Sequence, residues 1–205
     1  MKTVLVTGAN GLLGTNVVLE LLSRGYAVKG LVRSLRRFID YSHPQLELVT
    51  GDVRDVSSLQ AAVRGCDFIV HTVADTSQKH LRISDYDPVN FEGTKNILEL
   101  CRQEGIKRLV YIGTANTCGC RSLENPGDEQ SPPSHPFTHC LYALSKIKAG
   151  ELIEAAVSEG LDIVTLSPTF MIGPYDYKPS SGRIINMALN RKVVFYPPGG
   201  KNFVH

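Results

Sequence analysis

The sequence predicts an α/β protein with a doubly wound parallel sheet of the Rossmann type, with helices on both faces, followed by part of a small second domain. Two observations support this prediction. Short apolar, strand-like segments alternate with amphipathic helical segments, a pattern typical of parallel βαβ units. A glycine-rich turn joins the first of these strands to the first helix. We expect the main domain to span residues 1–167 and the partial second region to span residues 168–205.

Six strand-like segments are continuous apolar runs rather than alternating ones, so we expect both faces of each strand to be covered. They are Thr3–Thr7, Ala27–Val32, Leu46–Thr50, Phe68–Val73, Leu109–Gly113 and Ile163–Leu166. Helical patterns lie between them, and glycines mark where all four of the helices end. These patterns are the Leu13–Leu22 stripe before Gly25, Val56–Val63 with Asp55 as N-cap and Gly65 as its stop, the Ile97–Cys101 stripe before Gly105, and Leu141–Ser158 before Gly160.

The composition fits a folded protein with one main core. The chain has 205 residues, of which 42% are hydrophobic and 20% charged, and these values argue against extended disorder. No apolar run approaches the length of a membrane span, so we expect no membrane partner. The net charge of +2 comes from intermixed acids and bases, which gives no reason to expect nucleic acid binding. The amino terminus enters a strand without a signal-peptide pattern, which predicts a cytoplasmic protein.

The five cysteines favour reduced thiols over a disulfide framework, because the number is odd and the spacing is not that of a small scaffold. Cys118, Cys120, His135, His139 and Cys140 lie close together in the sequence. They lack the paired C-x-x-C spacing of closed zinc sites, so we expect no metal site.

Residues 116–139 form a long segment rich in proline and polar residues, which predicts a loop. Loops of this length in compact domains are usually functional, and we expect this one to face the substrate side, with a merely mobile excursion as the alternative. After residue 168 the alternation weakens to a short helical pattern at Ile184–Leu189 and a strand-like Val193–Tyr196. We expect the chain to stop partway through the second domain, which predicts exposed apolar side chains near residues 193–205.

The glycine-rich turn has the spacing Gly8-x-x-Gly11-x-x-Gly14. One glycine permits the turn, one lets backbone amides approach a pyrophosphate, and one allows close packing of helix on strand. The helix N-terminus that follows favours an anion. We therefore predict a dinucleotide site, with a purely structural turn as the alternative. Its expected contacts from this segment are Gly8, Asn10, Gly11, Leu12, Leu13 and Gly14.

The end of the second predicted strand favours NADP over NAD. NAD-binding proteins of this fold carry an acid there for the adenosine ribose, whereas this chain has Val32 and Arg33. A guanidinium can bind a phosphate with two hydrogen bonds. The alternative is that Arg33, Arg36 and Arg37 form a solvated basic surface, and NAD remains possible. Asp52, followed by Val53, is expected to contact the adenine or to serve as a turn residue.

Several motifs occur in the order found in the extended short-chain dehydrogenase/reductase family, which the chain resembles over nearly its whole length. They are Thr7–Gly14, Asp52-Val53, Asn90-x-x-Gly93-Thr94, Thr114 before Cys118-Gly119, and Tyr142-x-x-x-Lys146. The run from Gly25 to Arg33 most resembles the dihydroflavonol-reductase and 3β-hydroxysteroid-dehydrogenase-like branch.

The resemblance implies roles for residues outside the glycine-rich turn. Thr114, Tyr142 and Lys146 are the implied catalytic residues, and Tyr142 and Lys146 also contact the cofactor. Val73, Ala74 and Pro168 are expected near the nicotinamide. Asn90 is expected to anchor a neighbouring strand end or a proton-relay water, although a helix-start asparagine is an alternative from its local preference. Phe170, Met171, Tyr175 and Tyr177 are expected to line the substrate side or simply to pack.

The catalytic chemistry also follows from the residues themselves. Tyr142 and Lys146 are four residues apart on a predicted helix and share one face, although an ordinary i,i+4 pair is the alternative. A neighbouring ammonium favours the phenolate, so we expect Lys146 to lower the pKa of Tyr142 towards the range useful for proton transfer. Thr114 is expected to donate a hydrogen bond to the reacting oxygen.

These expectations predict an NADP-dependent oxidoreductase that transfers hydride to or from a carbonyl or hydroxyl of a small molecule, with Tyr142 as general acid/base. One alternative is a nucleotide-sugar epimerase or dehydratase with NAD, and another is a non-catalytic dinucleotide-binding protein or fragment. The resemblance implies a homodimer formed through helices corresponding to Pro88–Glu104 and Leu141–Ser158. The fold does not select the substrate.

Overall fold

The computed structural model describes residues 1–119, 121–122, 124–177, 181–189, 191–195 and 202–205. The strands are β1 (Thr3–Thr7), β2 (Ala27–Val32), β3 (Leu46–Thr50), β4 (Phe68–His71), β5 (Arg108–Ile112), β6 (Ile163–Leu166), β7 (Phe170–Met171) and β8 (Phe203–Val204). The α-helices are α1 (Leu12–Ser23), α2 (Val56–Val63), α3 (Glu92–Gln103), α4 (Leu141–Ser158) and α5 (Arg183–Ala188). A π-helical turn, η3 (Asp87–Phe91), leads into α3, and short 3-10 turns lie at η1 (Leu35–Arg37), η2 (Ile83–Asp85), η4 (Ala115–Thr117) and η5 (Phe137–His139).

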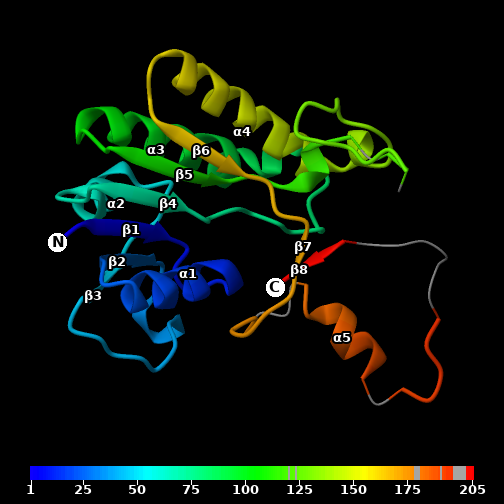
Figure 1. Cartoon of the computed structure of the whole chain (residues 1–205), viewed down its shortest axis with the longest axis horizontal. Helices are drawn as coiled ribbons and strands as arrows, with labels where there is room; N and C mark the ends of the chain where they lie inside the picture. Colours follow the sequence, from blue (N-terminus) through cyan, green and yellow to red (C-terminus); the bar gives the residue numbers. More distant parts are fainter. Residues whose placement is uncertain (120, 123, 178–180, 190, 196–201) are drawn as a thin grey trace.

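A parallel sheet of six strands, in the order β3-β2-β1-β4-β5-β6, forms the centre of the molecule (Figure 1). Every neighbouring pair is parallel, so the carboxyl ends of all six strands meet at one edge. The chain runs outward from β1 to β3 and then crosses back to β4 beside β1. Ligands of doubly wound sheets bind at such a reversal of strand order.

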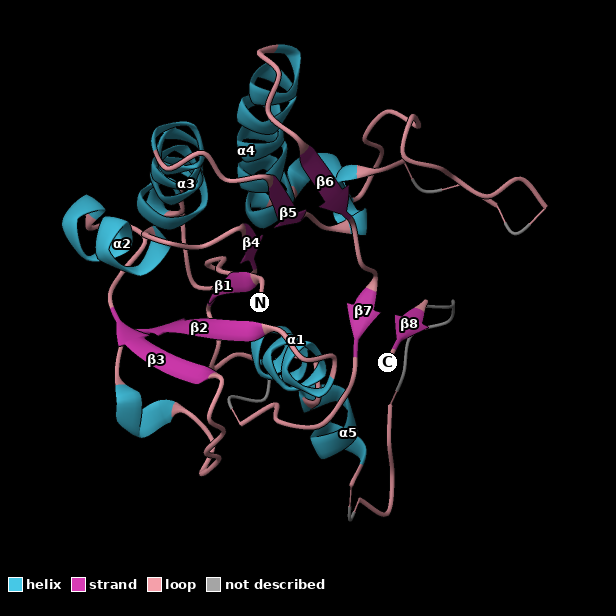
Figure 2. Cartoon of the chain, turned by 60° about the vertical axis from the view of Figure 1, so that its left-hand side comes forward, coloured by secondary structure: helices cyan, strands magenta, loops and turns pink. Residues whose placement is uncertain are grey.

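Helices cover both faces of this sheet, as the sequence predicts. Helices α2, α3 and α4 lie on one side and α1 lies on the other (Figure 2). The larger apolar cluster joins α2, α3 and α4 to the sheet through side chains such as Leu59, Ile97 and Ile153. The smaller cluster packs Val18 and Leu22 of α1 against the other face. The expected Rossmann-type architecture is therefore confirmed.

The predicted helix boundaries are confirmed at two informative positions. Gly25 has φ +80°, a conformation that favours glycine, directly after α1 and its C-cap. The carboxylate of Asp55 accepts a hydrogen bond from the Ser57 backbone N–H at 3.1 Å, which caps α2. Both signals act within one turn of the chain, so they can be predicted from neighbouring residues alone.

Strand β4 is shorter than predicted and ends at His71 instead of Val73. Beyond His71, the Thr72 backbone N–H and hydroxyl donate to the Thr7 hydroxyl at 3.2 Å and to the Thr7 carbonyl at 2.6 Å. Hydrogen bonds that involve the two threonine hydroxyls thus replace the backbone hydrogen bonds between β1 and β4 at this point.

The predicted strand at Val193–Tyr196 is wrong for residues 193–195, which form no strand, and Tyr196 lies outside the described residues. The strand nearby is β8 instead, which pairs with β7 in parallel. Two-residue strands give no periodicity from which to predict them.

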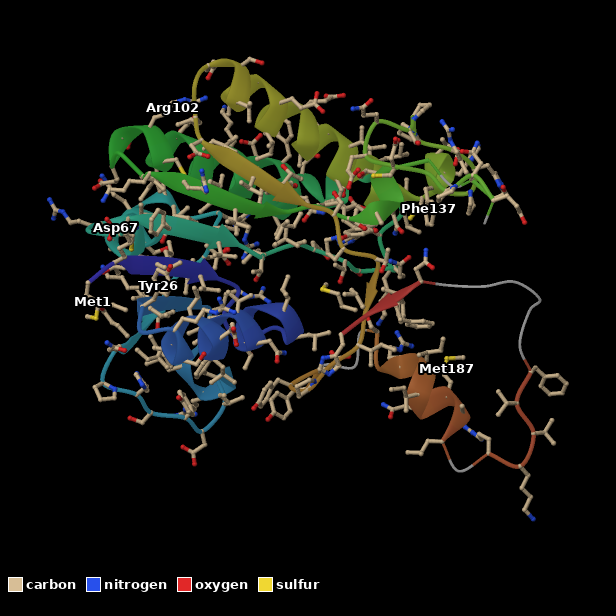
Figure 3. All side chains as sticks on the ribbon, viewed as in Figure 1. Met1, Tyr26, Asp67, Arg102, Phe137 and Met187 are labelled. Atoms are coloured by element: carbon tan, nitrogen blue, oxygen red, sulfur yellow. The ribbon has the colours of Figure 1, made fainter. Side chains whose placement is uncertain are left out.

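The apolar side chains expected to be exposed near residues 193–205 are exposed, with Phe195 at 94%. Met187 of α5, at 72%, also projects from the molecule (Figure 3). The described residues contain no helix that is both long and apolar enough to span a membrane.

Candidate active site

A groove of about 1110 Å³ follows the carboxyl ends of β1 to β4. It contains the whole glycine-rich turn and the predicted residues after β2, β3 and β4. The predicted cofactor residues that line it are Gly8, Asn10, Gly11, Leu12, Leu13, Gly14, Arg33, Asp52, Val53, Val73 and Ala74. The parallel order of the strands brings these distant segments together at one edge of the sheet.

The glycine-rich turn leaves a backbone cradle at the N-terminus of α1. Gly8 adopts φ +69°, and a Cβ added to Gly14 would lie 2.1 Å from the Gly8 carbonyl oxygen. No side chain caps α1, whose N-cap residue is Gly11. The first amides of the helix therefore remain without a side-chain partner beside the groove, and this arrangement fits an anionic group such as a pyrophosphate.

Arginines line the groove where β2 ends. Arg33 follows Val32 directly, and Arg36 lies one turn further along. The segment holds no carboxylate until Asp40. The charge at this end of the groove therefore suits a phosphate.

Asp52 is held by its neighbour Arg54, with Oδ1 and Oδ2 accepting from the guanidinium at 2.9 and 2.7 Å. Its Oδ1 also accepts from the Arg54 backbone N–H at 3.0 Å. The hydrogen bonds from Arg54 hold the pKa of this carboxyl below its usual value. Two roles were expected for Asp52, a contact with the adenine and a turn residue. These local contacts with Arg54 are those of a turn residue.

The groove also has walls that the sequence did not single out. Thr76 and Ser77, in the loop after β4, line it together with Phe38 and Ile39. Thr76 and Ser77 could have been predicted, because they follow the carboxyl end of β4. Phe38 and Ile39 had no such signal.

The segment after β7 forms the opposite wall through Met171, Tyr175 and Tyr177. It is tied to α1 by the Asn16 amide, which donates to the Pro174 carbonyl at 3.1 Å. Phe170 instead packs edge-on against Phe203. Of the aromatic and methionine residues expected on the substrate side or in packing, only Phe170 is thus withdrawn from the groove.

Thr114 and Tyr142 have neighbouring side chains, close enough for the Thr114 hydroxyl to act on the pKa of the phenol. Thr114 follows β5, and the Ala115 backbone N–H next to it donates to the Pro168 carbonyl at 3.0 Å, which fixes the ends of β5 and β6 together. Burial raises the pKa of the Tyr142 phenol to about 12, against the opposing effect of the Thr114 hydroxyl. The phenol is therefore protonated at neutral pH.

Lys146 is on the same helix as Tyr142, but its amine turns into the core. Only 4% of the residue is exposed, and Nζ donates to the Tyr111 hydroxyl at 2.6 Å and to the Ile112 carbonyl at 2.9 Å. Burial lowers the pKa of the amine to about 7. The expectation that Lys146 lowers the pKa of Tyr142 is wrong for this structure, because burial dominates and the amine faces Tyr111.

Asn90, which is 2% exposed, anchors the segment after β4. Its Oδ1 accepts from the Asp75 backbone N–H at 2.7 Å, and its Nδ2 donates to the Asp75 carbonyl at 3.0 Å. Nδ2 also donates to the Ser145 hydroxyl at 2.9 Å. The anchoring role is confirmed, while Asn90 lies inside η3 and not at the start of α3. Ser145 was not singled out, because its partner is 55 positions away.

The structure thus divides the predicted site into two neighbouring parts. The described residues that line the groove do not include Asn90, Thr114, Tyr142, Lys146 or Pro168. Thr114 and Pro168 follow β5 and β6, Tyr142 and Lys146 lie on α4, and Asn90 of η3 is bonded to Ser145 of α4. Asp75 connects the parts, since it lines the groove and is held by Asn90.

The model of a family described as "NAD dependent epimerase/dehydratase family" matches residues 4–194. A protein from Synechocystis sp. named "Putative dihydroflavonol 4-reductase" is 33% identical over 202 residues, covering 97% of this chain and 58% of the relative. A "3-beta-hydroxysteroid dehydrogenase" from Mycolicibacterium neoaurum is 34% identical over 158 residues, covering 73% of this chain and 42% of the relative. The chain thus spans about half the length of these curated relatives.

Among solved structures, the fold is similar to that of a Thermus thermophilus UDP-glucose 4-epimerase in complex with NAD. The TM-score is 0.77 and the sequence identity is 28%. The similarity covers 91% of this chain and 61% of the other.

Proposed function

The chain belongs to the NAD dependent epimerase/dehydratase family, whose model matches residues 4–194, and we propose that it acts as an NADP-dependent carbonyl reductase. The observation that carries this proposal is an arginine-lined groove next to the paired side chains of Thr114 and Tyr142. The names of the two relatives, a dihydroflavonol reductase and a hydroxysteroid dehydrogenase, support oxidoreduction at a carbonyl or hydroxyl. The substrate is a small molecule.

The groove supports dinucleotide binding through its backbone. The close approach of Gly14 to the Gly8 carbonyl and the uncapped start of α1 provide a cradle for the pyrophosphate. Arg33 and Arg36 would hold the 2′-phosphate that distinguishes NADP from NAD. The Asp52 carboxylate, which also lines the groove, is already paired with the guanidinium of Arg54.

The chemical step uses Thr114 and Tyr142. A dinucleotide held in the groove would supply the hydride that reduces the carbonyl carbon. Thr114 holds the carbonyl oxygen through its hydroxyl, and Tyr142 donates its phenolic proton to that oxygen as the alcohol forms. A phenol that is protonated at neutral pH suits this reductive direction, because it begins the reaction as the proton donor.

Three measurements test the proposal. Fluorescence titration with NADPH and NADH should give the tighter binding to NADPH. A panel of ketones and aldehydes, followed by the loss of nicotinamide absorbance, should then identify a substrate.

With that substrate, Tyr142→Phe should lower kcat by about 100-fold or more and leave NADPH affinity within a factor of a few. Tyr26→Phe, at the opposite end of the molecule from Phe137 and the start of α4 (Figure 3), is the control. Equal kcat in wild type and Tyr142→Phe contradicts the mechanism.

A second candidate is a nucleotide-sugar epimerase that uses NAD. The 28% identity to an epimerase solved with NAD favours it, whereas Arg33 at the end of β2 does not. An epimerase retains its dinucleotide through the cycle, so tightly bound NAD released by denaturing the purified protein would favour this candidate. Release of no NAD, together with preferential binding of added NADPH, would favour the reductase.

A further inference from the structure

Tyr111, which no sequence motif singled out, makes the closest contact of the Lys146 amine. Its hydroxyl accepts from Nζ at 2.6 Å, and Nζ lies 4.2 Å from the centre of its ring. Tyr111 is 1% exposed and lies on β5, next to the Ile112 carbonyl that also accepts from Nζ. Two adjacent residues of one strand therefore hold the amine.

The position of Tyr111 is itself fixed from two sides. Its ring stacks on that of His71, its register partner on β4, with 6.0 Å between ring centres. The Thr94 side chain of α3 also lies close to its phenol and opposes the rise in the pKa of Tyr111 that burial causes. Packing of this kind holds the phenol oxygen in place, so it offers Lys146 a defined acceptor and not a mobile one.

The amine has no competing charged partner. Among the residues that the structure describes, no carboxylate pairs with Lys146. Lys146 is also absent from the residues that line the groove, although the family resemblance implies that it contacts the cofactor. Because only 4% of Lys146 is exposed and its amine is bonded to Tyr111 and the Ile112 carbonyl, contact with a ligand requires the amine to become more accessible.

We propose that Tyr111 is a positioning residue that holds the Lys146 amine withdrawn from the dinucleotide groove in the free protein. The proposal rests on the proposed function for the presence of a dinucleotide in the groove and on the cofactor contact that the resemblance implies for Lys146, but the holding contact depends on neither. Because the contact stabilises the free state, the free energy of breaking it opposes dinucleotide binding. Removing the Tyr111 hydroxyl therefore makes the amine more accessible and the binding tighter.

The first test needs no cofactor. Wild type, Tyr111→Phe and the control Tyr26→Phe are acetylated with an N-hydroxysuccinimide ester, and the rate at each lysine is measured by peptide mass spectrometry. Lys148, on the same helix and paired with Asp87 at 2.8 Å, is the internal reference. The ratio of Lys146 to Lys148 labelling should rise roughly three- to tenfold in Tyr111→Phe, the factor for one hydrogen bond, and stay constant in the control. An unchanged ratio overturns the proposal.

The second test separates holding from simple loosening of the core. The dissociation constant for NADPH should fall roughly three- to tenfold in Tyr111→Phe. A loosened core would raise it, so an unchanged or raised constant overturns the holding role. If wild type binds neither NADPH nor NADH, the proposed function fails, and the labelling ratio alone then decides the role of Tyr111.

Discussion

Asn90 holds the backbone of Asp75 at both of its polar groups, accepting from the N–H at 2.7 Å and donating to the carbonyl at 3.0 Å. The remaining proton of the amide goes to Ser145, the residue before Lys146. One buried side chain thus fixes the loop after β4, which lines the groove, against α4, which carries Tyr142 and Lys146. The two parts of the candidate site are joined through this amide.

Replacing Asn90 with alanine should destabilise the protein by about 2–4 kcal/mol. The change leaves both backbone groups of Asp75 without their partner in a buried setting, and an unpaired buried polar group costs roughly 1–3 kcal/mol. The free energy of unfolding, measured by urea denaturation, checks this value.

Asn96→Ala is the matched control for that substitution. Asn96 is half-buried, and among the described residues its amide makes one hydrogen bond, to the Val53 carbonyl at 2.9 Å. Its loss should cost about 1 kcal/mol. Equal losses at the two positions would show that Asn90 does not have the anchoring role described here.

Gly14→Ala should damage the glycine-rich turn. The new Cβ would lie 2.1 Å from the Gly8 carbonyl oxygen, and neither backbone segment can move away without displacing α1 or β1. We expect a loss of about 1–3 kcal/mol in unfolding free energy, as for an overpacked core, together with weaker NADPH binding. Thermal unfolding and dinucleotide titration measure the two effects.

Gly150→Ala provides the comparison, because Gly150 also lies within a helix but a Cβ there meets no atom within 4 Å. It should stabilise the protein by up to about 1 kcal/mol through helix propensity and leave NADPH binding unchanged. A similar destabilisation by both substitutions would rule out the contact with Gly8 as the cause.

The features that the sequence predicted best depend on neighbouring residues. The turn at Gly8, Gly11 and Gly14 and the cap at Asp55 are determined by a few consecutive positions, so spacing and residue type were sufficient. Parallel strands then bring the segments after β1, β2 and β4 to one edge, which is why the groove was predicted in outline.

The features that were missed depend on contacts between distant residues. Nothing in the spacing places Tyr111 against Lys146, which is 35 positions away, or Asn90 against Ser145. The pKa of Tyr142 was predicted in the wrong direction because four-residue spacing gives the helix face but not the burial or the side-chain direction of Lys146. Burial is a property of the whole fold.

Arg33→Ser should weaken NADPH binding by about tenfold or more and leave NADH binding within a factor of two. A charge-assisted hydrogen bond to a phosphate is worth roughly 1.5–3 kcal/mol, and only NADPH carries the phosphate proposed to lie there. Fluorescence titration with both dinucleotides measures the two affinities.

Arg102→Ser is the control, since Arg102 is absent from the residues that line the groove and pairs with Glu159 at the surface. It should change neither affinity, because exposed pairs contribute little. A loss of equal size for NADPH and NADH in Arg33→Ser would mean that this guanidinium does not distinguish the two dinucleotides.

Lys146→Met should raise the free energy of unfolding near pH 7, and the gain should shrink as the pH rises. Burial lowers the pKa of the folded amine from 10.5 to about 7, so between these values the unfolded chain binds the proton that the folded chain has lost. The stability of the wild type therefore increases across this range, at up to roughly 1.4 kcal/mol per pH unit from this group. Methionine fills similar space without a charge and lacks this dependence.

The quantity to measure is the difference in unfolding free energy between Lys146→Met and wild type, by urea denaturation from about pH 6.5 to 10. Taking the difference matters because burial raises the pKa of Cys66 and Cys101, and these thiols lower stability at high pH in both proteins alike. The difference should be on the order of a few kcal/mol near pH 7 and approach a small constant near pH 10. A difference that stays constant with pH would mean that the Lys146 amine keeps its proton, and therefore its charge, in the folded protein. The Tyr111 hydroxyl and the Ile112 carbonyl would then be the groups that stabilise this charge.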